Sequence, residues 1–270
     1  MSGISRLLPI LAVNFVGTLG LSIVLPFLVF VVNGWGGNAV IYGIVSASYS
    51  AFQLVGAPIL GRWSDRYGRR RILLLSQGGT LLSWVVFLIA FHLPAGALAQ
   101  VTSGPLGAFT VTLPLIVLLL ARSLDGLTGG NVSVANAYLA DISTEEDRSA
   151  NFGKLALVAN LGFVIGPALA GLLGGTALGF QLPVLAAIVI SIIALSIILL
   201  ALPESVPHAV ESDPDAALPH QVLGPGEREC VVAGEDGMNL RSVLRIPCIG
   251  HLLVTHFLVM LAFHFFYASF

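Results

Sequence analysis

The chain has 270 residues, of which 56% are hydrophobic and 10% are charged, and its mean hydropathy is +0.95. This composition excludes a soluble domain of ordinary kind, because a soluble core of this size does not need so many apolar residues. The 12 basic and 14 acidic residues are separated by long uncharged runs. The lengths of these runs allow the membrane crossings to be counted.

The apolar runs predict three pairs of membrane-spanning helices, because one crossing needs roughly 20 mostly apolar residues. Each pair is divided by a polar, glycine-rich turn. The first pair covers residues 7–61 with its turn at 33–38, the second covers 72–139 with its turn at 92–107, and the third covers 155–203 with its turn at 174–183. A seventh apolar run begins near Ile246 and continues to Phe270. The expected fold is therefore an all-α membrane protein.

Three regions are expected along the chain. Residues 1–203 form a six-helix transmembrane domain, and residues 246–270 form a truncated seventh transmembrane helix. Residues 204–245 between them are rich in proline, glycine and acidic residues and have no apolar periodicity, so they are expected to be a flexible cytoplasmic loop.

The basic residues predict the orientation of the spans. All of the 12 except Arg122 lie at the start of the chain or in connections that follow an even-numbered span. The positive-inside rule therefore places the N-terminus and these connections in the cytoplasm. The expected location is the inner (plasma) membrane of the cell, which the chain crosses several times.

The stretch 61–71, GRWSDRYGRRR, places five arginines and one aspartate in the connection between the second and third expected spans. Gly61 and Gly68 allow close approach of two backbones, and Asp65 can accept hydrogen bonds at a helix N-terminus. Anchoring at the anionic leaflet would explain the arginines equally well. It does not explain an aspartate between two glycines.

Three motifs resemble those of the major facilitator superfamily. The connection resembles the signature loop of that family: Gly61-x-x-x-Asp65-Arg66-x-Gly68-Arg69-Arg70. A second family motif is similar to Arg122-x-x-x-Gly126 in the fourth expected span. The glycine–proline motif of the drug:proton antiporters resembles a pattern in the fifth: Gly162-x-x-x-Gly166-Pro167-x-x-Ala170-Gly171. The run 137–153 also resembles tetracycline-efflux transporters, and the likeness as a whole covers residues 7–202.

This resemblance implies a fold of twelve helices in two six-helix halves, with the substrate cavity between them. The chain would supply the N-terminal half, the central loop and most of a seventh helix, as a half-transporter or a fragment. In the family, an acid at the cytoplasmic end of the fourth span pairs with the loop charges, and Asp141 occupies that place. Relatives also carry acids in the first and third spans, where Gly17 and Ser83 stand here. These two departures put the usual proton coupling of the family in question.

Arg122 and Asp125 are the charged residues expected within the membrane. Their spacing of three residues places them on one helical face, roughly 16 Å deep, near the bilayer centre. Ionisable groups at this depth usually face a cavity and carry function, although a structural pair between helices is the alternative. By elimination, Asp125 is the expected proton carrier. Asn14 and Gln53 are candidate cavity residues, or partners in hydrogen bonds between helices.

The motif residues Gly162, Gly166, Pro167 and Gly171 have two interpretations. Small residues four apart permit close helix contact, and proline bends a helix, which suits a helix that rocks during alternating access. Simple packing of two helices would need the same residues.

The expected function is secondary active transport, most simply proton-coupled efflux of a small amphipathic compound of the tetracycline or multidrug kind. Transport of a sugar or metabolite is one alternative, and a truncated chain that transports nothing is another. The expected partners are the lipid bilayer, a small-molecule substrate, protons, and a missing C-terminal half or a second copy, with no nucleic acid. No enzyme activity, cofactor or metal site is expected.

Overall fold

The computed structural model describes residues 3–102, 107–129, 131–204, 250–251, 253–255 and 257–259. Contacts divide the chain into two units, Met1–Ala209 and Val210–Phe270. The expected central loop lies outside the described residues except for Glu204. Within the expected seventh span, the described residues are helical and the others lie outside the description.

Seven helices and a two-stranded ribbon make up the described part of the first unit. They are, in chain order, α1 (Gly3–Gly34), α2 (Ala39–Tyr67), α3 (Arg69–Ala90), β1 (Ala97–Val101), β2 (Phe109–Thr112), α4 (Leu113–Thr128), α5 (Asn131–Ile142), α6 (Glu145–Gly174) and α7 (Gln181–Ala201). Among the described residues, 6 stretches are long and apolar enough to cross a membrane, and α4 and α5 together form one of them. The expected all-α membrane fold with six spans is confirmed.

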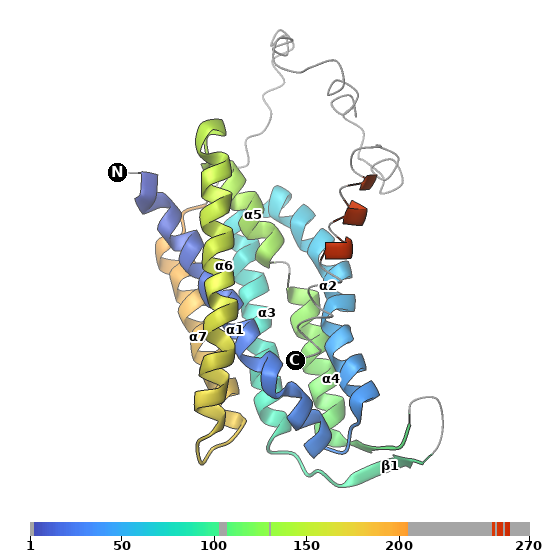
Figure 1. Cartoon of the computed structure of the whole chain (residues 1–270). Coiled ribbons are helices and arrows are strands. Elements are labelled where there is room, and N and C mark those ends of the chain that lie inside the picture. The colour runs from blue at the N-terminus through green and yellow to red at the C-terminus, as the bar shows by residue number, and fades with distance from the viewer. Residues whose placement is uncertain are drawn as a thin grey trace. The chain divides into compact units, whose positions relative to one another are not determined.

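The helices lie side by side in a bundle (Figure 1). Helix α1 packs against α6 and α7, α2 packs against α4, and α3 lies between α4 and α7. The interior contains two apolar clusters. One is built around the aromatic side chains of Phe27, Trp84 and Phe87, and the other around Leu73 and Tyr138. These contacts hold α1, α3 and α4 close together in the membrane-spanning part.

Helix α2 is longer than the sequence pattern predicted. It continues to Tyr67, and Gly68 alone separates it from α3. Gly68 has a φ of 98°, a conformation that a residue without a Cβ adopts readily. The expected turn at 61–71 is therefore mostly helical, and Asp65 lies in the last turn of α2 and not at a helix N-terminus.

Helix α6 also extends beyond its apolar part. It begins at Glu145 and not near residue 155, because the backbone N–H of Asp147 donates to Oγ1 of Thr144 at 3.3 Å and caps the helix. Acidic residues in the first turn favour this start through the helix dipole.

A β-ribbon replaces the irregular connection expected between the third and fourth spans. Strands β1 and β2 pair in antiparallel fashion at one end of the bundle (Figure 1). Thr110 donates its N–H to the carbonyl of Gly36 at 2.8 Å, and Thr112 Oγ1 donates to the carbonyl of Trp35 at 2.8 Å. The β-branched residues of β2 favour an extended chain. The ribbon is thus fastened to the turn between α1 and α2.

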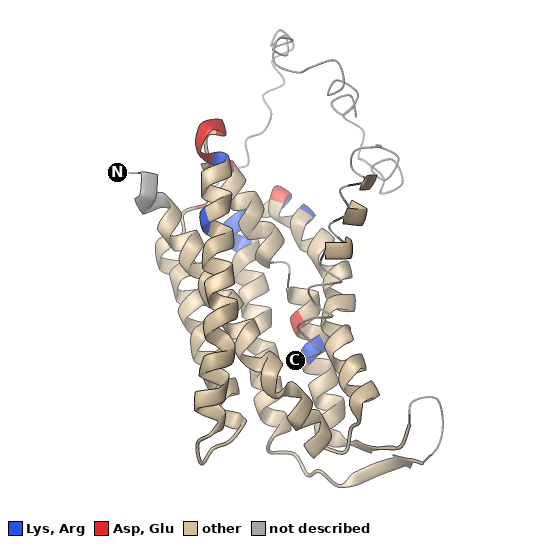
Figure 2. Ribbon diagram, in the orientation of Figure 1, with Lys and Arg blue, Asp and Glu red and all other residues tan. Residues whose placement is uncertain are grey.

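Charged residues gather at the end of the bundle opposite the ribbon (Figure 2). One acidic and one basic patch lie within the bundle on α4, whose charged residues are Arg122 and Asp125. The ribbon end carries no charged residue among those described.

Candidate functional site

Arg122 and Asp125 form an ion pair inside the bundle. Nη1 of Arg122 lies 3.1 Å from Oδ2 of Asp125, and their side chains are 3% and 6% exposed. Removing two charges from water is costly, and their mutual attraction offsets this cost only when other polar groups assist. The neighbours of the pair are therefore informative.

The two members of the pair face different neighbouring helices. The guanidinium of Arg122 stacks over the ring of Tyr49 from α2, 4.6 Å from the ring centroid. Thr80 and Ser83 of α3 lie near the carboxylate of Asp125, and Ser83 Oγ donates to the carbonyls of Gly79 and Thr80 in its own helix. Nε of Arg122 is buried and has no hydrogen-bond partner in the described part of the chain. The pair thus lies between α2 and α3.

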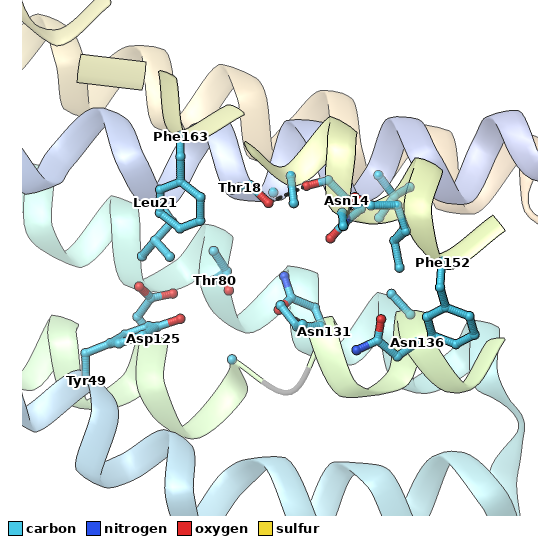
Figure 3. Close-up of a pocket in the computed structure, with 18 of the residues that line it drawn as sticks. Asn14, Thr18, Leu21, Tyr49, Thr80, Asp125, Asn131, Asn136, Phe152 and Phe163 are labelled. Carbon is cyan, nitrogen blue, oxygen red and sulfur yellow. Dashed lines mark hydrogen bonds between the residues drawn. The ribbon is translucent and has the colours of Figure 1, made fainter. Parts of the chain in front are cut away.

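A cavity of about 320 Å³ lies beside the pair. Asp125 lines this cavity, whereas Arg122 does not. The other polar lining side chains are Asn14, Thr18, Tyr49, Thr80, Asn131 and Asn136. Figure 3 shows them around a common space, with Phe152 and Phe163 contributing apolar walls. The cavity combines aromatic surfaces, uncharged hydrogen-bonding groups and one carboxylate.

The membrane span that carries Asp125 is divided into α4 and α5. Helix α4 ends at Thr128, and α5 begins at Asn131. Two side chains from other helices accompany this division: Gln53 Nε2 donates to the carbonyl of Gly129 at 2.9 Å, and Ser76 Oγ donates to the carbonyl of Thr128. Gln53 also donates to the hydroxyl of Tyr49 at 3.2 Å. Backbone carbonyls that accept no hydrogen bond within their own helix need a donor from elsewhere in the protein, because the membrane interior offers no water.

The two candidate cavity residues differ in their positions. Asn14 lines the cavity, and its Nδ2 donates to the carbonyl of Leu155 in α6 at 3.1 Å. Gln53 does not line the cavity and instead binds at the division between α4 and α5. Asn14 therefore has both of the roles that the sequence left open, whereas Gln53 has only the hydrogen bond between helices.

The two positions at which the family resemblance implies membrane acids lie near Asp125. Gly17 lines the same cavity, and Ser83 lies near the Asp125 carboxylate. A carboxylate is thus present at this cavity, although it is supplied by a different helix.

Arg69 joins three elements at the charged end of the bundle. Its side chain is 10% exposed, and its Nε lies 3.0 Å from Oδ2 of Asp141. Its Nη1 donates to Ser64 Oγ at 2.7 Å and also pairs with Asp65. Helices α2, α3 and α5 therefore meet through one guanidinium.

Arg70 fastens the start of α3 to the end of α7. Its side chain donates to the carbonyls of Ile198 and Leu199, at 3.2 Å and 2.5 Å. Its backbone N–H donates to Oε1 of Glu204 at 2.9 Å. A side chain at Gly68 would displace this carboxylate, but the φ of 98° is what requires glycine here.

The remaining residues of the loop motif make fewer contacts. Arg66 is exposed and its guanidinium lies 5.5 Å from the ring centroid of Tyr67. A Cβ at Gly61 would meet nothing within 4 Å. The structure thus brings Asp65, Arg69 and Asp141 together and leaves the other two apart.

The glycine motif of α6 faces α1 at two of its positions. A Cβ at Gly166 would overlap the hydroxyl of Ser22, and a Cβ at Gly162 would lie 3.0 Å from the backbone nitrogen of Leu19. Ser22 Oγ also donates to the carbonyl of Gly162 at 2.8 Å. Gly171 has open space, and Pro167 lies within the helix. Close packing on α1 is the role that the contacts of this motif support.

Four residues at the site carried no clear sequence signal: Tyr49, Thr80, Asn131 and Asn136. Single polar residues in apolar helices are common, and their pattern does not distinguish a cavity from a helix contact. The pair Gly129-Gly130 followed by an asparagine was the one available signal, because glycine ends helices and asparagine caps their starts.

The sequence matches the family model of the Major Facilitator Superfamily over residues 10–270. It is 32% identical over 198 residues to the class E tetracycline resistance protein of Escherichia coli, which covers 72% of this chain and 43% of that protein. It is 26% identical over 180 residues to multidrug resistance protein 2 of Bacillus subtilis, and this match covers 67% of this chain and 39% of that protein.

A solved structure has the same fold. The crystal structure of the human organic anion transporter MFSD10 (TETRAN) superposes with a TM-score of 0.60 and 20% sequence identity, covering 76% of this chain and 49% of that one. The chain spans less than half the length of the curated relatives that it matches.

Proposed function

Because this multi-pass membrane chain belongs to the Major Facilitator Superfamily, we propose that it serves proton-coupled export of a small amphipathic compound. One observation carries the proposal: within the membrane-spanning part, the carboxylate of Asp125 faces a cavity and is paired with Arg122. Ionisable groups at such depth mark proton relays and substrate pathways. The tetracycline and multidrug resistance relatives support export as the direction.

The ion pair offers a means of proton exchange. Proximity to a guanidinium favours the ionised carboxylate, and separation from it favours the protonated acid. The ring of Tyr49 from α2 lies against Arg122, whereas Thr80 and Ser83 of α3 lie near Asp125. A movement between α2 and α3 would change the separation of the two groups. Asp125 would then bind a proton in one state of the transporter and release it in the other.

The proposal includes a second six-helix half, which a C-terminal half or a second copy of the chain would supply. Alternating access in this superfamily is a movement of two such halves around a site between them. We further propose that the charged end of the bundle and the N-terminus lie in the cytoplasm, and that the chain resides in the inner (plasma) membrane.

The test is tetracycline uptake driven by a pH gradient, measured in proteoliposomes that contain the complete transporter assembly. Asp125→Asn should lower this uptake at least tenfold while tetracycline binding stays measurable, because the amide keeps the shape but carries no exchangeable charge. Arg122→Ala should weaken both uptake and binding. Ser123→Ala is the matched control, since Ser123 only donates to the carbonyl of Leu119 in its own helix. Normal gradient-driven uptake by Asp125→Asn would make the pair structural.

A further inference from the structure

Asn131 faces the cavity with its amide group in a fixed orientation. Its Oδ1 accepts the backbone N–H of Val132 at 2.9 Å, at the start of α5. That oxygen satisfies an N–H that the helix itself leaves free. The amino group of Asn131 is left for the cavity, and it lies 3.5 Å from the position that a Cβ on Gly17 would occupy. This wall therefore presents a hydrogen-bond donor.

Asn14 presents the opposite group. Its Nδ2 donates to the carbonyl of Leu155, so the amino group is occupied by the contact between α1 and α6. Of the described residues, none donates to its Oδ1. Figure 3 shows Asn14 and Asn131 on the wall of the same space, one from α1 and one from α5. The cavity thus has an acceptor on one side and a donor on the other.

The backbone contacts prevent either amide from reversing. A flipped Asn131 would place its amino group against the N–H of Val132, and a flipped Asn14 would place its oxygen against the carbonyl of Leu155. Each flip would set like groups against each other and break the hydrogen bond to Val132 or to Leu155. The donor and the acceptor are therefore preset features of the cavity.

We propose that the cavity recognises an aromatic amphipath through an edge that carries a hydrogen-bond acceptor beside a donor, such as a secondary carboxamide. The acceptor of the ligand meets the amino group of Asn131, and its donor meets Oδ1 of Asn14. The aromatic part lies against Trp84 and Phe163, which line the same cavity. This inference rests on the proposed function and names the substrate class for it.

Gly17 is part of this recognition. Its missing side chain leaves the space between α1 and the amino group of Asn131 open. Asn136 lines the cavity without a hydrogen-bond partner in the described ranges. Its amide can turn to present either its donor or its acceptor. Asn136 therefore allows the cavity to accept different ligands but does not fix the direction of a hydrogen bond.

Three probes of similar shape test the proposal: N-methyl-2-naphthamide, N,N-dimethyl-2-naphthamide and 2-isopropylnaphthalene. The first has both a donor and an acceptor, the second lacks the donor, and the third lacks both. Binding to the detergent-solubilised protein is measured by isothermal titration calorimetry. The protein should bind the secondary amide about tenfold more tightly than the tertiary amide, as expected for one additional hydrogen bond.

Two variants assign the groups. Asn14→Val should bind the two amides equally, because the acceptor for the amide N–H is gone. Asn131→Ser keeps an oxygen that can cap α5 but lacks the amino group. It should weaken both amides about tenfold and leave 2-isopropylnaphthalene unchanged. Asn160→Val is the matched control, since Asn160 is exposed on α6 and does not line the cavity.

A merely structural role would weaken all three probes together, and that result would overturn the inference. Failure of the secondary amide to bind, or equal binding of the two amides to the unaltered protein, would overturn it as well. Gradient-driven transport by a protein that does not discriminate the amides would leave the proposed function standing. Discrimination without proton-coupled transport would leave the recognition standing and remove the proposed function.

Discussion

At the scale of single residues, Arg69 is a buried cation shared by two acids of unequal exposure. The side chain of Asp65 is 61% exposed, whereas that of Asp141 is 18% exposed. Water competes with the first contact far more than with the second, because exposed ion pairs contribute little to stability. The contact of Asp141 with Arg69 is therefore expected to contribute more to the stability of the fold than the contact of Asp65, although both acids bind the same guanidinium.

Replacing the two acids separately should reveal this difference. Asp141→Asn is expected to lower the free energy of unfolding by about 1–3 kcal/mol, since it weakens a charged hydrogen bond to a buried group. Asp65→Asn is expected to cost less than about 1 kcal/mol. Thermal unfolding in detergent measures both. An equal or larger loss for Asp65→Asn would show that its contact is protected from water in the membrane.

The sequence predicted the members of the ion pair but not what surrounds them. Two charges in an otherwise apolar span are conspicuous, so the chain's own residue pattern is enough to single out Arg122 and Asp125. Tyr49 could not be singled out in this way, because an aromatic residue in a membrane helix is ordinarily explained by packing. Its contact with Arg122 depends on how α2 lies against α4, which no local pattern specifies.

At the scale of elements, α1 and α6 approach closely because two glycines of α6 face the backbone of α1. Gly166 lies against Ser22, while Gly171 of the same motif has open space. The motif itself was visible in the sequence. Which of its glycines are needed for packing was not, since that depends on the face that α6 turns toward α1.

The two glycines therefore provide a matched pair of substitutions. Gly166→Ala should destabilise the protein by about 1–3 kcal/mol, because the new methyl group overlaps Ser22 and must separate the helices. Gly171→Ala should have no destabilising effect, since alanine favours helix and meets nothing within 4 Å. Chemical unfolding followed by circular dichroism compares them. Equal stability of the two variants would contradict the observed α1–α6 contact.

The break between α4 and α5 depends on a hydrogen bond from another helix, and this dependence can be tested. Gln53→Leu removes the donor to the carbonyl of Gly129 and the contact with Tyr49. The first turn of α5 should then exchange its amide hydrogens faster, by about tenfold if one hydrogen bond is lost. Mass spectrometry of deuterium uptake measures this. Ser48→Ala is the control, because Ser48 donates only to its own helix.

Unchanged exchange in Gln53→Leu would mean that Ser76 alone secures the division. The sequence indicated the six spans but neither this division nor the β-ribbon. Glycine pairs are frequent in membrane helices, and a short alternation of β-branched residues beside an apolar span resembles the span itself. Both features are decided by hydrogen bonds to distant segments, Gln53 in one case and the turn at Gly36 in the other.

At the scale of the whole six-helix unit, charge is confined to one end of the bundle, apart from the buried pair on α4 (Figure 2). The positive-inside rule predicts that this end faces the cytoplasm. The ribbon and the turn between α1 and α2 then face the opposite side. The sequence alone gives this prediction, because it depends on the count of basic residues and not on packing.

Single cysteines in a variant with Cys230 and Cys248 replaced by serine can test this orientation. Gly34→Cys, near the ribbon end, should react with an impermeant maleimide in sealed cells. Ala150→Cys, near the charged end, should react only after the membrane is opened. Gly34 is chosen over Gly36 because Gly36 has a φ of 93° and a Cβ there would crowd Thr110. Labelling of Ala150→Cys in sealed cells would reverse the assigned orientation.

The packing of α1 on α6 and α7 has a consequence for synthesis at the ribosome. Helix α1 finds its main partners only when the last two helices of the unit have been translated. Until then the amide of Asn14 lacks the carbonyl of Leu155, whereas the hydroxyl of Ser22 can donate to the carbonyl of Leu19 in its own helix. A nascent chain must therefore shelter the amide of Asn14 for more than a hundred residues of elongation. Chains interrupted before α6 would expose this amide to lipid and become targets for degradation.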